Sequence, residues 1–211
     1  GIALSSGVVR GISHIGILKV LEREKVPIDF VAGTSIGALI GALYCSGTTI
    51  EEMENLVNTA KWRELVDFTI PKNGLIAGKK IEAFISKILK KKTFEELNIP
   101  LSIVATDLNS GDKVVFSEGD IIKAVKASIS MPGVFEPVLD GDSILADGGL
   151  VDPIPVDIIK SMGADIVIAV DLTIDLKRNK EPEKKIESTM KEFFEREFIS
   201  TEIAFLKDFL Q

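Results

Sequence analysis

Cysteine and histidine are almost missing from this sequence of 211 residues. Cys45 is the only cysteine, so the chain can form no internal disulfide and no cysteine-based metal cluster. His14 is the only histidine, which restricts the catalytic triads that the chain can assemble. The low cysteine content also suits a reducing compartment.

Basic charge and long hydrophobic runs are also scarce. There are 25 Lys and Arg residues against 32 Asp and Glu, and the net charge is −7. This balance argues against general nucleic-acid binding, because phosphate contacts need a basic surface, and against constant docking on anionic lipid. No apolar run reaches the roughly 18 residues of a membrane span, and no signal peptide is visible, although Gly1 already lies in an apolar stretch and the natural start can lie upstream. We expect a cytoplasmic protein that binds no nucleic acid, with transient peripheral contact to a membrane left open.

The residues that are present fit one globular domain. Hydrophobic residues make up 45% of the chain and charged residues 27%, and the length is sufficient to bury a sizeable core. Neither an internal repeat nor a linker divides the sequence. We therefore predict a single domain over 1–211 that ends in a charged amphipathic helix over 182–211.

Apolar segments alternate with helical patterns in the first part of the chain. An apolar run over Ile2–Ser5 precedes a helical pattern, and a predicted buried strand over Ile28–Ala32 leads through Gly33 into a helix over Ile36–Tyr44. This alternation is typical of a parallel sheet with helices on both faces. The predicted fold class is α/β, as a three-layer α/β/α sandwich with a mainly parallel central sheet. Further predicted elements are a helix over Lys79–Lys91, a strand over Leu101–Asp107, a returning hairpin strand over Lys113–Ser117, a helix over Ile121–Ala127 and a fully buried strand over Ala164–Leu172.

Gly33-Thr34-Ser35-Ile36-Gly37 is the main chemical signal. A nucleophilic serine needs a sharp turn between a strand and a helix, and glycines on either side remove the side chains that would clash there. The serine would then lie at a helix N-terminus, where backbone N–H groups favour negative charge. The alternative is a packing turn, in which Gly33, Gly37 and Gly41 seat the helix against the sheet. The position of the motif between a predicted strand and a predicted helix favours Ser35 as a nucleophile.

A nucleophilic serine needs a base, and the sequence offers two candidates. His14 shares a helix face with apolar residues such as Leu18, which indicates a satisfied core histidine, and it precedes the serine, whereas the α/β-hydrolase order places histidine last. Asp147 follows an apolar strand and precedes Gly148-Gly149, which let another backbone or a ligand approach closely. A carboxylate in dry surroundings is basic enough to accept a proton. Asp147 is therefore the preferred base, with a plain Asp-Gly-Gly turn as the alternative.

Four blocks occur in a recognisable order along the chain. They are Ser5-Ser6-Gly7-Val8-Val9-Arg10-Gly11, the motif around Ser35, Ala127-Ser128-Ile129-Ser130-Met131-Pro132, and Asp147-Gly148-Gly149. With these blocks, the chain resembles the bacterial branch of the patatin-like phospholipase family over about Ile2 to Leu172. That family uses a Ser-Asp dyad without histidine, which agrees with the chemistry that the residues themselves favour.

The resemblance implies a patatin-like fold and a lipid acyl hydrolase of the phospholipase A or lysophospholipase type. Asp147 would take the proton of Ser35, which attacks an ester carbonyl and forms an acyl-enzyme that water hydrolyses. The implied partner is a lipid or ester substrate, and no metal or organic cofactor is implied. The other residues with implied roles are Ser6, Gly7 and Val8 as the oxyanion hole, Arg10 and Gly11 as support for that loop, Gly33 and Gly37 in the elbow, and Ser128, Pro132, Gly148 and Gly149 around the dyad.

The predicted oxyanion loop departs from the family at two positions. The family has three consecutive glycines where this chain has Ser6-Gly7-Val8, and a β-branched valine resists a positive φ. If the loop needs that conformation at Val8, the oxyanion hole is strained or unformed. The alternative function is therefore a catalytically weak or inactive patatin-fold protein that binds lipid. A phosphate-binding protein is more remote, because Ser5–Gly11 contains neither G-x-G-x-x-G nor a Walker lysine.

The predicted C-terminal helix has two interpretations. Its aromatic residues Phe193, Phe194 and Phe198 either pack on the core of the domain or form a surface for a membrane or a partner. We expect the first, because an amphipathic helix usually buries its apolar face within its own domain.

Overall fold

The structure is a computed structural model that describes residues 1–59 and 78–172, apart from the side chain of Val9. The chain divides into two units, Gly1–Thr173 and Ile174–Gln211, and all the described residues belong to the first. The helix predicted over 182–211, with its phenylalanines, lies outside the described residues. The single domain over 1–211 therefore stays a prediction.

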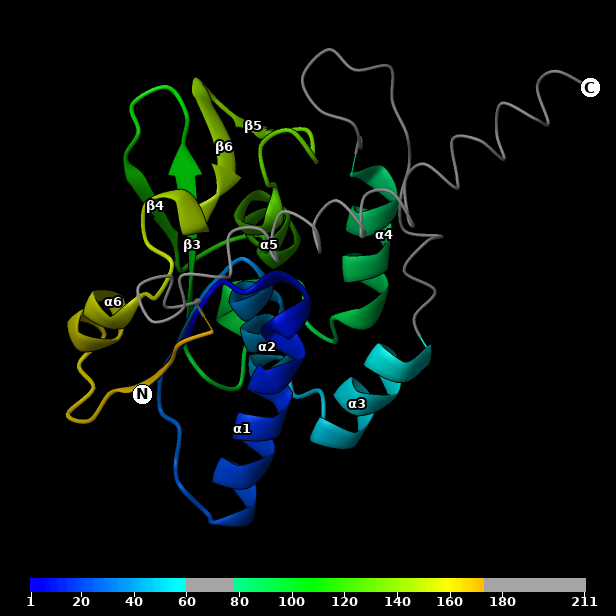
Figure 1. Cartoon of the computed structure of the whole chain (residues 1–211), viewed down its shortest axis with the longest axis vertical. Coiled ribbons are helices and arrows are strands. Elements are labelled where there is room, and N and C mark those ends of the chain that lie inside the picture. Colours follow the sequence, from blue (N-terminus) through cyan, green and yellow to red (C-terminus); the bar gives the residue numbers. More distant parts are fainter. Residues whose placement is uncertain (60–77, 173–211) are drawn as a thin grey trace, which may run out of the picture. The chain divides into compact units, whose positions relative to one another are not determined.

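Strands and helices follow one another along the described ranges, in part alternating and in part in runs of one kind (Figure 1). The strands are β1 (Ile2–Leu4), β2 (Val31–Thr34), β3 (Leu101–Asp107), β4 (Lys113–Phe116), β5 (Val138–Asp140), β6 (Ser143–Asp147) and β7 (Ile168–Val170). The α-helices are α1 (Ile12–Arg23), α2 (Ile36–Cys45), α3 (Ile50–Thr59), α4 (Lys79–Ile88), α5 (Ile121–Ile129) and α6 (Val156–Ser161). Short 3-10 turns are η1 (Val8–Gly11), η3 (Phe94–Glu96) and η4 (Gly148–Leu150).

A parallel group of strands, β7-β1-β2-β3, forms the centre of the sheet. The residues of β1 and β2 are buried throughout, as expected for short apolar strands that are covered on both faces. In register, Ile2 pairs with Val31 of β2 and with Ile168 of β7. The predicted α/β class with a mainly parallel central sheet is confirmed.

The antiparallel strands gather around β3. β4 pairs with residues 103–106 of β3, while β2 pairs with residues 101–104 and β6 with residues 105–107. Because β4 overlaps both other strands in this register, it occupies one edge of β3, and β2 and β6 share the opposite edge end to end. This arrangement brings the last residues of β2 and β6 together.

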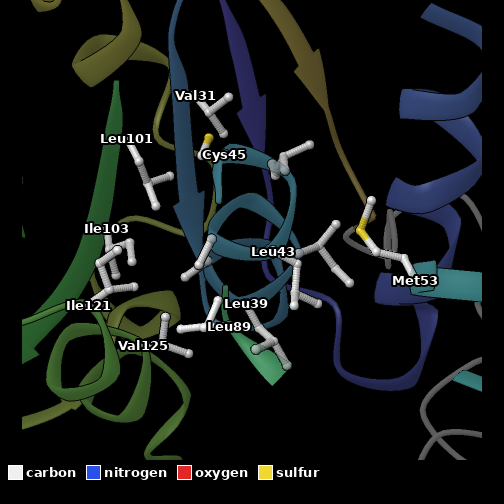
Figure 2. Close-up of a cluster of buried hydrophobic side chains, with 14 of the residues drawn as sticks. Val31, Leu39, Leu43, Cys45, Met53, Leu89, Leu101, Ile103, Ile121 and Val125 are labelled. Carbon is white, nitrogen blue, oxygen red and sulfur yellow. The ribbon is translucent and has the colours of Figure 1, made fainter. Parts of the chain in front are cut away.

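Helices cover the two faces of the sheet unequally. On one face, side chains of β1, β2 and β3 pack with those of α1 to α5 in the largest hydrophobic cluster. Figure 2 shows this cluster around α2, with Leu39 and Leu43 among Val31, Ile103 and Val125. On the other face, a smaller cluster joins alternate residues of the same strands to Ile158 and Ile159 of α6. α2 is the central helix and is apolar along nearly its whole length because it is buried on nearly all sides.

Element boundaries differ from the prediction in several places. The segment Ala164–Leu172 is not a fully buried strand: only Ile168–Val170 is strand, β7 pairs with β1 alone within the described residues, and Ile166 is 74% exposed. An apolar run shows that a segment is hydrophobic but not how many strands flank it. A strand that lies at the edge of the described sheet was therefore predicted to be fully buried. β2 begins later than expected, at Val31, and α4 ends earlier, at Ile88, where Leu89 is already extended.

Within the described ranges, none of the helices is both long enough and apolar enough to span a lipid bilayer.

Candidate active site

Ser35 occupies the turn between β2 and α2. Its backbone has φ 56° and ψ −122°, a conformation that residues other than glycine rarely adopt. A Cβ added at Gly33 would lie 2.5 Å from the Gly37 carbonyl oxygen, and one added at Gly37 would lie 2.2 Å from the Leu4 carbonyl oxygen. The sharp turn and the close packing of α2 on β1 therefore depend on glycine at both positions.

Asp147 reaches Ser35 through the register of the sheet. β2 pairs with β3 up to Thr34 and Val104, and β6 pairs with β3 from Asp147 and Ala105 onward. The two strands run in opposite directions along the same edge, so their carboxyl ends meet although 112 positions separate Ser35 from Asp147. The Ser35 hydroxyl donates a hydrogen bond of 2.6 Å to Asp147 Oδ2, and both residues are buried.

Hydrogen bonds fix both the carboxylate and the backbone of Asp147. Oδ1 accepts from the Gly149 N–H at 2.7 Å, and the Asp147 carbonyl accepts from the Thr106 hydroxyl at 2.8 Å. The Asp147 N–H donates to the Ser130 carbonyl at 2.9 Å. A Cβ at Gly148 would lie 2.3 Å from a carbonyl oxygen of β3, so only glycine allows the chain to turn here without moving the sheet.

The electrostatic environment of Asp147 suits a base. Burial raises the pKa of its carboxyl above the usual range, and the hydrogen bonds from Ser35 and Gly149 oppose that rise. A hydroxyl that donates to a buried carboxylate at this distance can transfer its proton without further rearrangement. Among residues 1–59 and 78–172, no group of His, Cys, Asp and Glu side chains is placed to hold a metal ion.

The C-terminal end of α5 borders both members of the pair. The Ser128 hydroxyl, which is fully buried, accepts from the Ser35 N–H at 2.8 Å. Two residues later, the Ser130 carbonyl accepts from the Asp147 N–H. Pro132 is exposed in the turn that follows, so the predicted support around the pair comes from Ser128 rather than from the proline ring.

The loop after β1 lies beside the Asp147 turn. A Cβ at Gly149 would be 3.4 Å from the Ser6 side chain. The Ser6 N–H donates to the Pro153 carbonyl at 2.9 Å and is not available to a substrate oxygen, which corrects the prediction that included Ser6 in the oxyanion hole. The N–H groups of Gly7 and Val8 have no partner in the described part of the chain. They are the donors that this loop can offer.

Val8 carries the backbone strain of the loop. Its φ is 49°, in the left-handed region, whereas the φ of Gly7, 171°, lies outside that region. A β-branched side chain in the left-handed region costs about 1–2 kcal/mol or more. The side chain of Val8 is 51% exposed, so little packing compensates for this conformation.

Gly11 and Arg10 have different relations to the site. A Cβ at Gly11 would lie 2.0 Å from Ile36 Cγ1, so this glycine is required by the residue that directly follows Ser35. The Arg10 N–H donates to the Gly7 carbonyl at 3.0 Å and closes η1. Arg10 is exposed, and its side chain makes no hydrogen bond or ion pair within the described ranges. Its support of the loop through charge stays a prediction.

His14 is buried in α1 and contacts the loop rather than Ser35. Its Nε2 lies 2.9 Å from the Ser5 carbonyl oxygen, and because a carbonyl can only accept, Nε2 carries the proton. Nδ1 has no hydrogen-bond partner in the described part of the chain. Burial lowers the pKa of the imidazole. The expected core histidine is therefore buried, but only one of its nitrogens is satisfied.

Other polar residues reach the site without a signal that sequence analysis detects. The Thr34 hydroxyl donates to the Asp152 carbonyl at 2.9 Å, and Lys113 Nζ forms ion pairs with Asp152 and Asp157 at 2.9 and 2.6 Å. Together with Thr106, these contacts hold the segment that follows Asp147. Thr34, Thr106 and Lys113 come close to this segment only because β3 pairs with β2, β4 and β6, and that pairing cannot be predicted from local sequence.

Comparisons with known proteins agree with the fold and the motifs. A family model described as patatin-like phospholipase matches residues 2–160. Patatin-like phospholipase domain-containing protein 6 of Mus musculus is 35% identical over 179 residues, which cover 81% of this chain and 13% of the mouse protein. Lysophospholipase nte1 of Aspergillus fumigatus is 33% identical over 178 residues, which cover 82% of this chain and 12% of the fungal protein.

A bacterial relative and a solved structure show the same likeness. An uncharacterized NTE family protein of Mycobacterium tuberculosis is 36% identical over 174 residues, which cover 81% of this chain and 48% of that protein. The chain thus spans less than half the length of each of these relatives. The crystal structure of VipD from Legionella pneumophila matches with a TM-score of 0.59 at 16% identity, over 92% of this chain and 55% of that chain. At that identity, the match shows a shared fold.

Proposed function

The chain belongs to the patatin-like phospholipase family, and from that premise we propose that it is a serine acyl hydrolase that cleaves carboxylic esters of lipids. The observation that carries the proposal is the hydrogen bond of 2.6 Å from the Ser35 hydroxyl to the buried Asp147 carboxylate. A strained turn, a buried base and a direct hydrogen bond between them are what an activated serine requires.

The proposed mechanism uses the two side chains in succession. Asp147 accepts the proton as Ser35 Oγ forms a bond to the ester carbonyl carbon, and the carbonyl oxygen becomes an oxyanion. The tetrahedral intermediate collapses, the alcohol leaves with the proton from Asp147, and the acyl group stays on Ser35. Water then attacks the acyl carbon and gives a proton to Asp147. The second tetrahedral intermediate collapses as its bond to Ser35 Oγ breaks, Asp147 returns the proton to Oγ, and the carboxylic acid is released.

Backbone N–H groups supply the stabilisation of the oxyanion in this proposal. Gly7 and Val8 have N–H groups without partners in the described ranges, and the loop that carries them lies next to the turn after Asp147. Donors that point to the oxygen before charge develops lower the barrier most, because they need no rearrangement in the transition state.

A small apolar cavity lies beside the turn that carries Ser35. Its volume is about 40 Å³, it lies between α1, α2, α3 and α4, and its lining includes Ile36, the residue after Ser35, and Ile12, the residue after Gly11. Ligand pockets usually enclose roughly 300–1,000 Å³, so this cavity does not hold an acyl chain, and the lipid in the proposal rests on the family. The side chains of Val8, in the loop after β1, and of Leu150, in the turn after Asp147, are exposed, and these two segments are neighbours. Exposed apolar side chains next to the site support transient contact with a membrane surface.

A catalytically weak lipid-binding protein is the second candidate. The positive φ of Val8 favours it, because a strained loop can relax and turn an N–H group away from the substrate. This alternative predicts lipid binding without formation of an acyl-enzyme.

Hydrolysis of a short-chain ester such as p-nitrophenyl butyrate tests the proposal. Ser35→Ala should abolish turnover, and Asp147→Asn should lower kcat by about two to four orders of magnitude, because an amide cannot accept the serine proton. Ser46→Ala and Asp112→Asn are the matched controls, since they make the same changes away from the dyad. Turnover near that of the parent in purified Ser35→Ala would exclude Ser35 as the nucleophile.

A further inference from the structure

Ser5 is a fully buried serine at the start of the loop, and all its polar groups are engaged. Its N–H donates to the Val170 carbonyl at 3.1 Å, and its carbonyl accepts from His14 Nε2 at 2.9 Å. Its hydroxyl donates to the Ser6 carbonyl at 2.8 Å and accepts from the Leu172 N–H at 2.9 Å. Ser5 thus joins the end of β7, helix α1 and the loop in one hydrogen-bonded cluster.

The hydroxyl of Ser5 determines where the Gly7 N–H points. A trans peptide unit is planar, and its C=O and N–H point in opposite directions. The Ser6 carbonyl and the Gly7 N–H belong to the same unit, so a hydrogen bond that holds the carbonyl also fixes the direction of the N–H. The next unit is held in the same way, because the Gly7 carbonyl accepts from the Arg10 N–H, which fixes the Val8 N–H.

His14 holds Ser5 in place from the other side. The Ser5 carbonyl and the Ser6 N–H form one peptide unit, with His14 Nε2 at one end and the Pro153 carbonyl at the other. A unit bonded at both ends cannot rotate without loss of two buried hydrogen bonds. This restraint counts here, because the strain at Val8 favours rotation of the loop to a relaxed conformation.

We propose that Ser5 and His14 are positioning residues that aim the Gly7 N–H at the oxyanion of the substrate. The inference rests on the proposed function, in which the Gly7 N–H is an oxyanion donor. Ser5 acts through the Ser6 carbonyl, and His14 acts through Ser5. In this chain a buried serine and a buried histidine restrain a loop that lacks the glycine run of its family.

Ser5→Ala is the direct test, measured on the full chain with p-nitrophenyl butyrate. Loss of the hydroxyl frees the Ser6–Gly7 peptide unit, and we expect kcat to fall about 10- to 100-fold. This is less than the roughly 100- to 1,000-fold fall seen when one oxyanion donor is removed, because the Gly7 N–H is freed and not lost. KM should change less than about twofold, because the interaction belongs to the transition state. Ser46→Ala is the matched control: Ser46 is also buried and donates to a backbone carbonyl, but it caps the far end of α2.

A trifluoromethyl ketone inhibitor separates positioning from a general loss of structure. Its adduct with Ser35 carries an oxyanion in the place of the tetrahedral intermediate, so its affinity should fall in proportion to kcat/KM in Ser5→Ala. Unchanged inhibitor affinity with a lowered kcat would overturn the proposal.

The variants His14→Gln and His14→Asn test the second residue at similar size and polarity. Glutamine can place an N–H near the position of Nε2 and should retain most of kcat. Asparagine reaches only the position of Nδ1, so kcat should fall as in Ser5→Ala. Equal kcat in the two variants, or kcat of the parent in Ser5→Ala, would overturn the proposal. Absence of turnover at Ser35 in the parent would instead contradict the proposed function.

Discussion

Two residues of the site, Ser35 and Val8, have a positive φ, which is unfavourable for any residue with a side chain. Strain of this kind persists only where surrounding contacts hold it. At Ser35 those contacts are plain: the Ser128 hydroxyl holds its N–H, and close-packed glycines flank the turn. At Val8 the support comes from the hydrogen bonds of neighbouring carbonyls, because its own side chain is half exposed. Val8 is therefore the residue at which substitution should gain activity.

Val8→Gly should raise kcat with little change in KM. Glycine adopts a positive φ without strain, so the loop would spend more time with its N–H groups in place. Removal of about 1–2 kcal/mol of strain is opposed by about 0.5–1 kcal/mol of added freedom in the unfolded chain, so the free energy of unfolding should stay equal or rise slightly. Steady-state kinetics and urea unfolding measure the two effects.

Val20→Gly is the control for this substitution, because Val20 is exposed in the interior of α1. Glycine there should lower stability by about 0.2–0.5 kcal/mol relative to valine and leave kcat unchanged. A kcat for Val8→Gly that is equal to or below that of the parent would show that the loop already holds its donors correctly with valine.

Ionisation of Asp147 should determine the acidic limb of the plot of kcat/KM against pH. Because burial raises its pKa above the usual 3.8, kcat/KM should rise with pH around a midpoint above 3.8 as the carboxyl ionises. The pKa of His14 lies below 6.5, so no limb should titrate at 6.5. A limb near pH 6.5 that disappears in His14→Gln would assign the base to His14 instead.

The same shift has a consequence for stability. A carboxyl with a raised pKa in the folded state stabilises the fold when protonated, so its contribution is complete below pH 3.8 and is lost as the pH rises through the folded pKa. The free energy of unfolding of the parent, relative to Asp147→Asn, should therefore decline over that window and stay level above it. A rise with pH over this window would mean that the folded state lowers the pKa of Asp147.

At the scale of elements, α2 lies against the sheet closely enough to exclude a methyl group. Gly37 meets the Leu4 carbonyl, and Gly41 lies near the side chains of Val31 and Leu101. This close approach sets the position of Ser35 at the start of the helix. Substitution at Gly37 should therefore affect both the packing of the helix and the geometry of the nucleophile.

Gly37→Ala should lower the free energy of unfolding by about 1–3 kcal/mol and reduce kcat as well, because an added Cβ would lie 2.2 Å from a backbone oxygen that cannot move independently. Gly16→Ala is the matched change on α1, where nothing lies within 4 Å of the added Cβ. That variant should gain about 0.5–1 kcal/mol and keep its kcat. Chemical unfolding of both variants checks the pair; equal stability would contradict the packing described for α2.

Local pattern predicts the elements near Ser35 well, and long-range pairing less well. The turn between β2 and α2 can be predicted from sequence because its glycines and the apolar runs on either side lie within a few residues of one another. Three features cannot be predicted from local sequence, since each depends on which strands become neighbours. They are the position of β7 at the edge of the described strands, the bond of the Ser6 N–H to Pro153 and the contact of Thr106 with Asp147. The pairing of Ser35 with Asp147 is predicted from the scarcity of histidine, the apolar strand and glycines around Asp147, and the order of the motifs. None of these shows that the two residues are close, and the shared edge of β3 gives the physical reason.

At the scale of the whole molecule, the site exists only when distant segments assemble. The loop after β1, the turn before α2, the end of α5 and the turn after β6 each contribute a part, and all lie within residues 2–160 matched by the family model. None of these segments can place the dyad alone, because the hydrogen bonds that hold it run between them.

Labelling by a fluorophosphonate probe tests the central claim most directly, because the reagent reacts with an activated serine and leaves a covalent mark. We predict one adduct per chain, located on Ser35 by peptide mass mapping, absent in Ser35→Ala and formed far more slowly in Asp147→Asn than in Asp112→Asn. No adduct on the folded parent chain, or an adduct on another serine that persists in Ser35→Ala, would contradict the account.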